Sequence, residues 1–343
     1  MQLTSVAIFG ASGYSGIELA RLCATHPALE VKLLTSDRWV GEDAATRLGT
    51  LAGRTFVGHD DGLAQSKGCA VAFLATPAEV SLKLAPKLIS AGVRVIDLSG
   101  AFRLKDAALY PKFYAFEHTQ PALLAEAVYG LPELFRKDIG KARLVANPGC
   151  YPTAAALSLA PLLSSGLALN TGIVINAASG VSGAGRKASE EYTFMEIGDD
   201  VRAYKVLKHQ HTPEITQTLG QSAGGKVELV FTPHLLPLKR GILNTTVATL
   251  RPGATADQVK AAYTKAYAAE PLVQFLPSAE AVRLTNAAHT PRCLVGVSVD
   301  GDKVVAVSAI DNLLKGAASQ AMQNLNLLIG QPETTGLVAG AAK

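Results

Sequence analysis

The segment from residue 6 to residue 22 restricts the possible folds of this chain more than any other. Residues 6–9, Val-Ala-Ile-Phe, form a continuous apolar run, as in a strand that is buried on both faces of a parallel sheet. A turn with glycines at positions 10, 13 and 16 follows, and residues 17–22 have the apolar spacing of a helix. A strand, a glycine turn and a helix in this order bring backbone amides and a helix N-terminus to a phosphate group. The segment therefore predicts a nucleotide-binding α/β fold.

The second strand indicates which nucleotide is bound. The glycine spacing is G-x-x-G-x-x-G rather than the commoner G-x-G-x-x-G, so a plain tight turn is the alternative to a phosphate site. Residues 31–35 then read as a strand that ends in Ser36-Asp37-Arg38, where a dinucleotide fold meets the adenosine ribose. Asp37 can accept from the ribose 2′-hydroxyl, whereas Arg38 and the Ser36 hydroxyl suit a 2′-phosphate. With both kinds of group present we favour NADP(H) over NAD; a solvated polar loop is the alternative.

Two further strands with a helix between them continue the pattern. Residues 70–75 and 93–98 are apolar runs, and Thr76 with Pro77 supplies a cap and an N-terminal proline for the intervening helix. Strands that alternate with helices predict a doubly wound parallel sheet, which binds its ligand at the C-terminal edge. Arg103 follows the fourth strand at this edge and can hold phosphate or carboxylate, with a surface salt bridge as the alternative.

A lone cysteine occupies a position suited to catalysis. Cys150 follows a Pro-Gly turn and directly precedes an apolar, alanine-rich run that indicates a helix, while residues 141–146 look like a short strand. The partial positive charge at a helix N-terminus favours the thiolate, which attacks carbonyl carbon readily. Cys150 is therefore the candidate nucleophile. The other three cysteines, Cys23, Cys69 and Cys293, lie in apolar patterns and are expected to be small buried residues.

The composition changes after a strand expected at residues 172–178. Residues 179–187, Ser-Gly-Val-Ser-Gly-Ala-Gly-Arg-Lys, are rich in backbone donors and hydroxyls and end in two cations. Backbone amides and cations together can hold an anion. We expect an anion site here that includes Ser179, Arg186 and Lys187; a flexible linker is the alternative.

Two histidines stand two residues apart before a helix whose expected cap is Thr212. A metal site and a pair of surface histidines are the alternatives, but no Asp, Cys or third His lies at a helpful local spacing for a metal. We favour proton exchange with the reacting centre. His211 is preferred over His209 because it lies nearer the helix N-terminus, which holds down the imidazole pKa, and Glu214 would orient or polarise the site.

The rest of the chain predicts a second sheet. Residues 227–231 and 244–250 are strand-like, with Lys239 and Arg240 between them as candidate phosphate contacts. Residues 293–299 and 304–309 read as a hairpin with an Asp-Gly turn.

These elements define the predicted domains. We predict an α/β fold that combines a Rossmann-type doubly wound parallel sheet with an α+β catalytic domain whose sheet is mostly antiparallel or mixed. The dinucleotide-binding domain is residues 1–148, with a C-terminal helix in 317–343 that packs back on it, and the catalytic domain is residues 149–316.

Composition and charge exclude several classes of protein. A chain of 343 residues with 48% hydrophobic residues has ample material for a packed core. A net charge of +4 without a Lys/Arg run gives no sign of nucleic-acid binding. The apolar runs are shorter than the roughly 20 residues of a bilayer span, and the N-terminus lacks a charged signal-peptide region, so we expect a cytoplasmic protein that does not bind membranes. Four cysteines without C-x-x-C spacing argue against zinc and disulfides.

As a set, these motifs resemble the N-acetyl-gamma-glutamyl-phosphate reductase family, within the wider group of aspartate-semialdehyde and glyceraldehyde-phosphate dehydrogenase-like enzymes. The resemblance covers nearly the whole chain and rests on residues 10–16, 145–153, 179–186 and 311–317 and on the cluster of His209, His211 and Glu214. It implies catalytic roles for Cys150, His211, His209 and Glu214. It implies dinucleotide contacts at Gly10, Ser12, Gly13, Tyr14, Ser15, Gly16, Ser36, Arg38, Thr76, Ser182, Gly183 and Asn312. It implies substrate or phosphate contacts at Arg103, Asn147, Ser179, Arg186 and Lys187.

The resemblance also implies a reaction, a step of arginine biosynthesis. Cys150 would attack the gamma-carbonyl of N-acetylglutamyl phosphate, phosphate would leave, and NADPH would reduce the thioester to the semialdehyde. Apart from the resemblance, we expect no metal, and an exposed sheet face in the second domain would suggest a homodimer or homotetramer. One alternative is a reductase for N-blocked aminoadipyl phosphate or aspartyl phosphate. Another is an NADP-binding regulator whose Cys150 senses oxidants. The chain departs from the family pattern at Ala101, where an Asp is expected, although Arg103 is retained.

Overall fold

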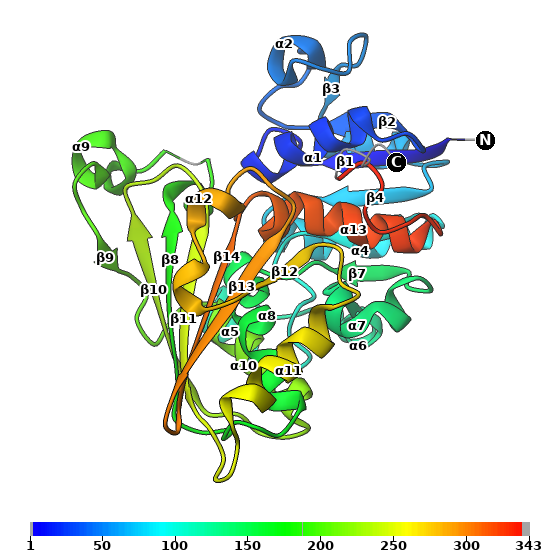
Figure 1. The fold of residues 1–343 in the computed structure, drawn as a ribbon. Helices are drawn as coiled ribbons and strands as arrows, with labels where there is room; N and C mark the ends of the chain where they lie inside the picture. Colours follow the sequence, from blue (N-terminus) through cyan, green and yellow to red (C-terminus); the bar gives the residue numbers. More distant parts are fainter. Residues whose placement is uncertain (1–2, 187, 338–343) are drawn as a thin grey trace, which may run out of the picture. The chain divides into compact units, whose positions relative to one another are not determined.

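The chain divides into two compact units in the computed structural model, which describes residues 3–186 and 188–337. The first unit is Met1–Gly149 together with Ala317–Lys343, and the second is Cys150–Gly316 (Figure 1). Each unit is built around its own sheet.

The first unit contains a sheet of seven parallel strands in the order β3-β2-β1-β4-β5-β7-β6. The strands are β1 (Thr4–Phe9), β2 (Leu29–Thr35), β3 (Phe56–Val57), β4 (Val71–Leu74), β5 (Arg94–Asp97), β6 (Val128–Tyr129) and β7 (Leu144–Ala146). The chain starts at β1, winds outward to β3, and then winds the other way from β4, which neighbours β1. This doubly wound order confirms the predicted Rossmann-type fold, and its direction reverses between β1 and β4, where such folds bind ligands.

Helices cover both faces of this parallel sheet. Successive residues of β1 point to opposite faces: Val6 and Ile8 pack in one core with helices α1 and α13, whereas Ala7 and Phe9 pack in another with α4. The helices are α1 (Tyr14–Thr25), α2 (Ala44–Leu48), α3 (His59–Gln65), α4 (Ala78–Ser90), α5 (Tyr110–Tyr114), α6 (Pro121–Glu126), α7 (Pro132–Ile139) and α13 (Ser319–Leu328). Residues of α13 are therefore part of the first unit's core.

The second unit contains a mixed sheet of seven strands in the order β12-β13-β14-β11-β8-β10-β9. The strands are β8 (Ile173–Gly180), β9 (Arg202–Ala203), β10 (Leu229–Leu236), β11 (Ile242–Thr249), β12 (Val273–Leu276), β13 (Cys293–Asp300) and β14 (Lys303–Ile310). β8 pairs in parallel with β10 and β12 with β13, while the other neighbours are antiparallel. The predicted hairpin is the β13–β14 pair. This mixed sheet agrees with the predicted fold class of the catalytic domain.

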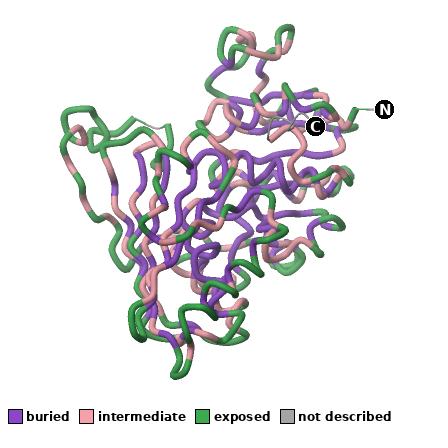
Figure 2. Tube along the Cα trace, viewed as in Figure 1, coloured by how far each residue is buried: buried purple, intermediate pink, exposed green. Residues whose placement is uncertain are grey.

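One helix forms the core of the second unit. α8 (Cys150–Ser164) is buried at every residue from Tyr151 to Leu163, whereas the neighbouring strand β11 alternates between buried and partly buried residues. Figure 2 shows the buried parts of the chain in purple. It packs on β11, β13 and β14, with α10 (His211–Ala223) and α11 (Ala256–Tyr267) beside it. The short helices α9 (Phe194–Ile197) and α12 (Leu284–Ala287) lie in connections. The helix includes Cys150 as its first residue, and Pro152 lies in its first turn, where proline is tolerated.

The face of this sheet opposite α8 is partly open. Ile175 and Phe231 are buried on the α8 side, and Phe231 contacts the Tyr151 ring of α8. Their neighbours Val174 and Val230 point the other way and are 37% and 45% exposed. Exposed apolar residues on one sheet face are typical of a surface that binds another protein.

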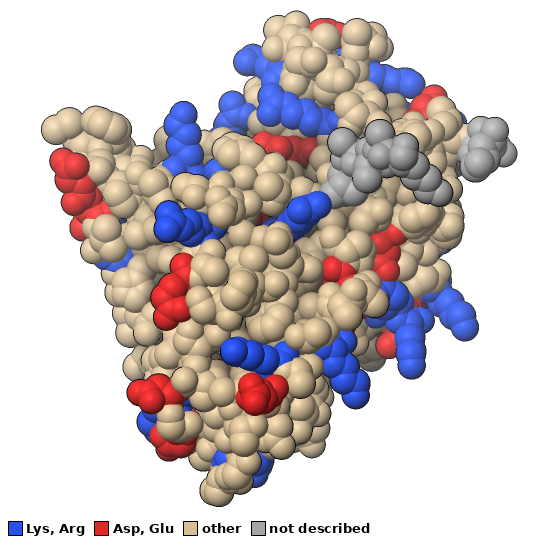
Figure 3. All heavy atoms as spheres, viewed as in Figure 1, with Lys and Arg blue, Asp and Glu red and all other residues tan. Residues whose placement is uncertain are grey.

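Charged side chains are dispersed over the visible surface. On the face drawn in Figure 3, Lys and Arg side chains are interspersed with acidic ones and separated by uncharged surface.

Candidate active site

Cys150 is the first residue of α8, directly after the Pro148-Gly149 turn. Its side chain is partly exposed, whereas the other three cysteines are buried, as the sequence predicted, and burial raises the pKa of Cys23 and of Cys69. A Cβ atom at Gly316 would lie 2.8 Å from the Cβ of Cys150. The backbone of residue 316 can therefore lie against the nucleophile only because that residue is glycine.

Cys150 lines a cavity of about 200 Å³ together with other residues of the second unit. The cavity brings together five of the predicted site residues, namely Cys150, Ser179, Gly183, His209 and His211. A partly enclosed site with a thiol, two imidazoles and backbone donors can bind and attack a carbonyl compound.

The two histidines occupy different environments. His211 begins α10, and its main-chain N–H donates to Nδ1 of His209 at 3.1 Å. Burial, together with the nearby charge of Lys205, lowers the pKa of His209 to about 3, so this ring stays neutral. The ring centroids of the two histidines are 4.8 Å apart. Glu214 lies in the first turn of α10 and is fully buried.

Tyrosines form one wall of the cavity. The Tyr204 hydroxyl donates to the Tyr151 hydroxyl at 3.1 Å, and the Tyr151 hydroxyl donates to the main-chain oxygen of His234 at 3.3 Å. Burial raises the pKa of both tyrosines, which keeps the phenols protonated. The Tyr151 ring also forms T-shaped contacts with both histidine rings. These contacts hold the imidazoles in place.

Two cations of the cavity were missed by sequence reasoning. Arg202 donates to Asp200 at 2.9 Å and to the main-chain oxygen of Glu191 at 2.9 Å. Lys205 donates to Gln210 at 3.2 Å and has a left-handed backbone with φ of 44°. A non-glycine residue in this region is strained, which is a common property of functional segments. Their segment contains only the two-residue strand β9, so no periodic pattern identified it.

The predicted glycine turn of the first unit has the geometry of a phosphate cradle. Gly10 has φ of +81°, and a Cβ atom there would lie 2.4 Å from the main-chain oxygen of Ala75. α1 begins at Tyr14 after this turn, with Gly13 as its N-cap. A Cβ atom at Gly16 would lie 2.3 Å from the Gly10 oxygen, so the helix packs closely on the turn. This close packing of turn and helix is the role that glycines have in dinucleotide folds.

Ser36 and Asp37, which follow β2, form hydrogen bonds with other residues of the first unit. The Ser36 hydroxyl donates to Ser12 at 2.8 Å and accepts from the main-chain N–H groups of Arg38 and Trp39. Asp37 accepts from the main-chain N–H of His59 at 2.9 Å, at the start of α3. Arg38 is exposed. The acidic residue is thus used as a helix cap beside an accessible guanidinium.

Other predicted residues of the first unit have structural partners. Thr76 follows β4, is nearly buried, and its hydroxyl is 2.8 Å from that of Ser81. Arg103 is 7% exposed and donates to the main-chain oxygens of Asn147 and Leu98. Asn147 is fully buried, accepts from Asn324 and donates to the oxygen of Ala317. These contacts fix the backbone at the ends of β5 and β7.

Ala101, which departs from the family pattern, is fully buried in the core that α4 covers. Its main-chain oxygen is 2.9 Å from Nε2 of His118. This contact gives the His118 ring a main-chain hydrogen-bond partner.

Three predicted residues of the second unit, Ser182, Gly183 and Asn312, lie close together, and of these Gly183 lines the cavity. Nδ2 of Asn312 donates to the Ser182 hydroxyl at 3.0 Å, and Gly183 is adjacent to both Asn312 and Ser179. Arg186 is exposed at the end of the same segment. Lys187 lies outside the described residues.

Family comparisons define the class of protein to which this fold and site belong. Residues 5–142 match the semialdehyde dehydrogenase NAD-binding domain, and residues 150–312 match the semialdehyde dehydrogenase dimerisation domain. The chain is 45% identical over 337 residues to an N-acetyl-gamma-glutamyl-phosphate reductase of Symbiobacterium thermophilum, covering 97% of each chain. It is 45% identical to that of Azotobacter vinelandii, with 99% of each covered, and 42% identical to that of Desulfotalea psychrophila, with 98% of each covered. The chain belongs to the N-acetyl-gamma-glutamyl-phosphate reductase family.

Solved structures of similar fold are more distant in sequence. The Vibrio cholerae aspartate semialdehyde dehydrogenase II complexed with ASA has a TM-score of 0.75 at 19% identity, with 96% of this chain and 99% of that chain covered. The Candida albicans aspartate semialdehyde dehydrogenase with NADP has a TM-score of 0.70 at 14% identity, with the same coverage. Both solved structures therefore have a fold similar to that of this chain.

Two further properties concern only the described residues. In that part of the chain no helix is long and apolar enough to cross a membrane. Within the same residues no group of three or more His, Cys, Asp or Glu side chains is arranged to hold a metal ion.

Proposed function

We propose that this chain reduces N-acetyl-L-glutamyl 5-phosphate to N-acetyl-L-glutamate 5-semialdehyde and phosphate through a thioester on Cys150. The observation that carries the proposal is the position of Cys150, at the first residue of α8 and in one cavity with His211. The substrate follows from the name shared by the curated relatives, which match the chain over nearly its full length.

Cys150 forms the covalent bond. Its sulfur attacks the acyl carbon, a C–S bond forms, and the C–O bond to phosphate breaks with its electron pair on the phosphate oxygen. The N-terminus of α8 stabilises the thiolate before the attack and again when the C–S bond breaks to release the semialdehyde.

His211 exchanges the proton of the second half-reaction. It donates a proton to the substrate oxygen when the thioester carbon is reduced, and it recovers that proton when the aldehyde forms. His209 suits this role less well, because its low pKa keeps the ring neutral and its Nδ1 is occupied by the His211 N–H. Glu214, buried in the first turn of α10, is proposed to orient the site.

NADPH supplies the hydride when it is bound. The turn at Gly10, Ser12, Gly13, Tyr14, Ser15 and Gly16 is the proposed pyrophosphate site, since it leads directly into the N-terminus of α1, where backbone N–H groups can hold an anion. We propose NADP(H) rather than NAD because Asp37 caps α3 and Arg38 is exposed beside it. Thr76, Ser182, Gly183 and Asn312 are further proposed contacts or supports of the dinucleotide.

The substrate carries two anionic groups, a carboxylate and the acyl phosphate. We assign the carboxylate to Arg202 and Lys205, two cations of the cavity that contains Cys150. Ser179, Arg186 and Lys187 are the proposed phosphate contacts. Arg103 and Asn147 bind neighbouring main-chain atoms, and we propose that they support the phosphate region through the backbone that they fix.

We propose that the protein works as a homodimer or homotetramer in the cytoplasm. The open face of the second sheet, with Val174 and Val230 exposed, suits a second copy of the chain, and the matching family model is described as a dimerisation domain. Free cysteine thiols suit a reducing compartment.

The proposal is tested in the oxidative direction. Purified protein is supplied with NADP, phosphate and N-acetylglutamate semialdehyde, and in parallel with aspartate semialdehyde or N-acetylated aminoadipate semialdehyde. We expect phosphate-dependent formation of NADPH with the first aldehyde and its loss in Cys150→Ser, with NADP binding retained. Preference for another aldehyde would reassign the substrate, and undiminished turnover by Cys150→Ser would refute the thioester.

A further inference from the structure

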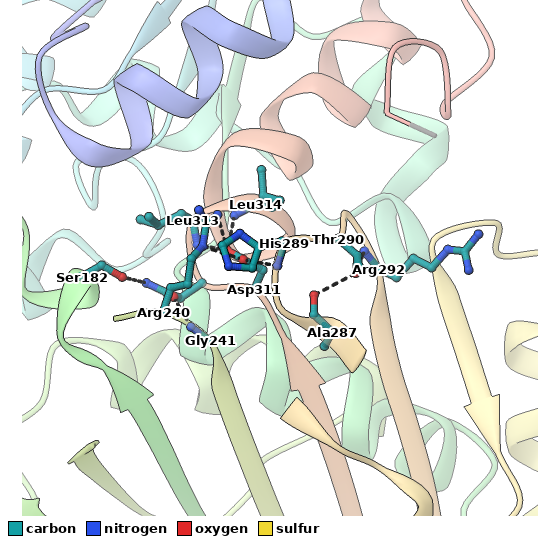
Figure 4. A network of polar contacts seen from close by, with 11 residues as sticks. Ser182, Arg240, Gly241, Ala287, His289, Thr290, Arg292, Asp311, Leu313 and Leu314 are labelled. Carbon is teal, nitrogen blue, oxygen red and sulfur yellow. Dashed lines mark hydrogen bonds and ion pairs between the residues drawn. The ribbon is translucent and has the colours of Figure 1, made fainter. Parts of the chain in front are cut away.

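We propose that Asp311 is a positioning residue, which holds the loops around Cys150 in their active arrangement. It lies at the end of β14 and is fully buried. The inference rests on the proposed function and adds to it a residue that does not touch the substrate. It follows from a network of polar contacts within the second unit (Figure 4).

The Asp311 carboxylate joins three separate parts of the chain. Oδ1 accepts from Nη2 of Arg240 at 2.8 Å and from the main-chain N–H groups of Leu313 and Leu314 at 2.9 and 3.1 Å. Oδ2 is 2.7 Å from Nε of Arg240 and accepts from the main-chain N–H of His289 at 2.7 Å. The backbone of His289 is left-handed, with φ of 62°, so its hydrogen bond to Asp311 stabilises a strained conformation.

Arg240 is therefore the charge partner of a buried carboxylate. Its side chain is 14% exposed and contacts Asp311 through two nitrogen atoms. Two-point pairing of this kind fixes both position and angle of the guanidinium. The sequence suggested Lys239 or Arg240 as a phosphate contact, whereas the structure assigns Arg240 to Asp311.

The loop that carries Arg240 supports one wall of the Cys150 cavity. Residues 180–182 are held to it by three backbone hydrogen bonds: Gly180 N–H to Gly241 at 2.9 Å, Val181 N–H to Leu238 at 2.8 Å, and Ser182 N–H to Lys239 at 3.0 Å. A Cβ atom at Gly180 would lie 2.6 Å from the main-chain nitrogen of Arg240. A shift of Arg240 would therefore move Gly180, a wall residue of the cavity.

The residues after Asp311 reach the same wall and the nucleophile. Asn312 accepts from the Gly241 N–H at 2.6 Å and donates to the Ser182 hydroxyl at 3.0 Å. The Gly316 N–H donates to the main-chain oxygen of Asp311 at 2.9 Å, and Gly316 lies against Cys150. Asp311 thus fixes two segments that border the reacting thiol, and Asn312 acts by supporting Ser182.

Replacing Asp311 with Asn tests this role. Asn keeps the shape and one acceptor oxygen, but it puts an NH₂ group in place of the other oxygen. At the Oδ2 position this NH₂ group faces Nε of Arg240 and the main-chain N–H of His289, which then lose their acceptor. Hydrogen exchange is measured on the full-length protein. We expect peptides covering residues 179–185 and 311–316 to exchange at least about tenfold faster, while the α11 peptide, residues 256–267, is unchanged. Unchanged exchange, or a uniform increase over the second unit, would overturn the proposal.

Kinetics give the second readout. Counting active sites by alkylation of Cys150, we expect kcat/KM per site to fall about 100-fold in Asp311→Asn, since small misplacements at a reacting centre have effects of this size. Asn312→Ala should produce a similar loss, and the double variant should lose little more than either single variant. A per-site kcat and KM equal to those of the wild type would show a purely structural role.

A control variant tests whether the effect is specific to position 311 or follows from any change of Asp to Asn. Asp302→Asn makes the same change in an exposed carboxylate that pairs with Lys303 at 3.2 Å in the β13–β14 turn. It should leave exchange and kinetics unchanged. If the wild type turned over no aldehyde, the proposed function would fail, and the exchange experiment alone would still decide whether Asp311 positions these loops.

Discussion

The main-chain N–H of His211 donates to Nδ1 of His209 across 3.1 Å, so the two imidazole rings lie in different environments. Because Nδ1 of His209 accepts a hydrogen bond, its ring proton is on Nε2. Burial holds the pKa of His209 near 3, so it does not exchange protons at neutral pH. It fixes the start of α10 and thereby the backbone of His211.

The first prediction concerns this division. His211→Ala should lower kcat by about 100-fold or more, because it removes the proposed acid and base. His209→Asn should retain far more activity, since an Asn side-chain oxygen can accept the same N–H. Steady-state rates from pH 6 to pH 9 measure both. An equal or larger loss in His209→Asn would move the acid–base role to His209.

The second prediction concerns pH and stability. The pKa of His209 is lowered from 6.5 to about 3 on folding, so the unfolded chain binds a proton that the folded chain does not. This contribution to stability is fully present above pH 6.5 and is lost as the pH falls toward 3, by at most about 1.4 kcal/mol per pH unit.

Chemical denaturation at pH 7 and pH 5 measures the effect. The wild type should lose up to about 2 kcal/mol more than His209→Asn between these values. Burial also lowers the pKa of His26 and of His118, but these residues are the same in both proteins and cancel in the comparison. An identical pH dependence would contradict the assignment of a neutral His209.

The third prediction concerns Gly316. A methyl group at this position would lie 2.8 Å from the Cβ of Cys150, so Gly316→Ala should displace the nucleophile and lower kcat by about 100-fold, with a destabilisation of about 1–3 kcal/mol. Gly225→Ala is the control, because no atom lies within 4 Å of the Cβ position there. Comparable activity in the two variants would show that the close approach is unimportant.

The fourth prediction concerns the choice of dinucleotide. Arg38→Ala should raise the KM for NADP by about 10-fold or more and leave that for NAD nearly unchanged, because only NADP has a 2′-phosphate. Asp37→Asn should leave the KM for NAD unchanged, since Asp37 accepts from His59 N–H. A symmetric effect of Arg38→Ala on the two dinucleotides would refute the assignment.

The fifth prediction concerns the substrate carboxylate. Lys205→Met keeps an unbranched side chain that is one atom shorter and removes its charge, and it should raise the KM for N-acetylglutamate semialdehyde by about 10-fold with a smaller effect on kcat. Lys208→Met, at an exposed position outside the cavity lining, is the control. Similar kinetic constants in the two variants would remove Lys205 from the substrate site.

The sequence predicted the parts of the fold that follow from local patterns. Apolar runs and the glycine turn identified β1, β4 and β5 and their helices, and the Asp-Gly pair identified the β13–β14 turn. The order of strands in the second sheet was not predictable, because neighbours such as β8 and β11 are distant in the chain.

The sequence predicted those residues of the candidate site that lie in short motifs of reactive side chains. Cys150, His209 and His211 are examples, and the structure brings them to one cavity. Arg202 and Lys205 lie in a segment without a periodic pattern of apolar residues. In such a segment the sequence does not distinguish a cation of the site from any other exposed cation. The proposed role of Asp311 could not be predicted from the sequence, because its partners His289 and Arg240 are 22 and 71 residues away from it along the chain.

The core of the first unit is completed by the end of the chain, since Met322 and Leu325 of α13 pack with Leu19 of α1. During synthesis, the ribosome makes α13 only after all of residues 150–316. The second unit is continuous in sequence and can fold as soon as it emerges from the ribosome. The core of the first unit is complete only after α13 has also emerged. A nascent chain that stops before Ser319 would therefore leave an apolar sheet face uncovered, and would be a substrate for chaperones and proteases.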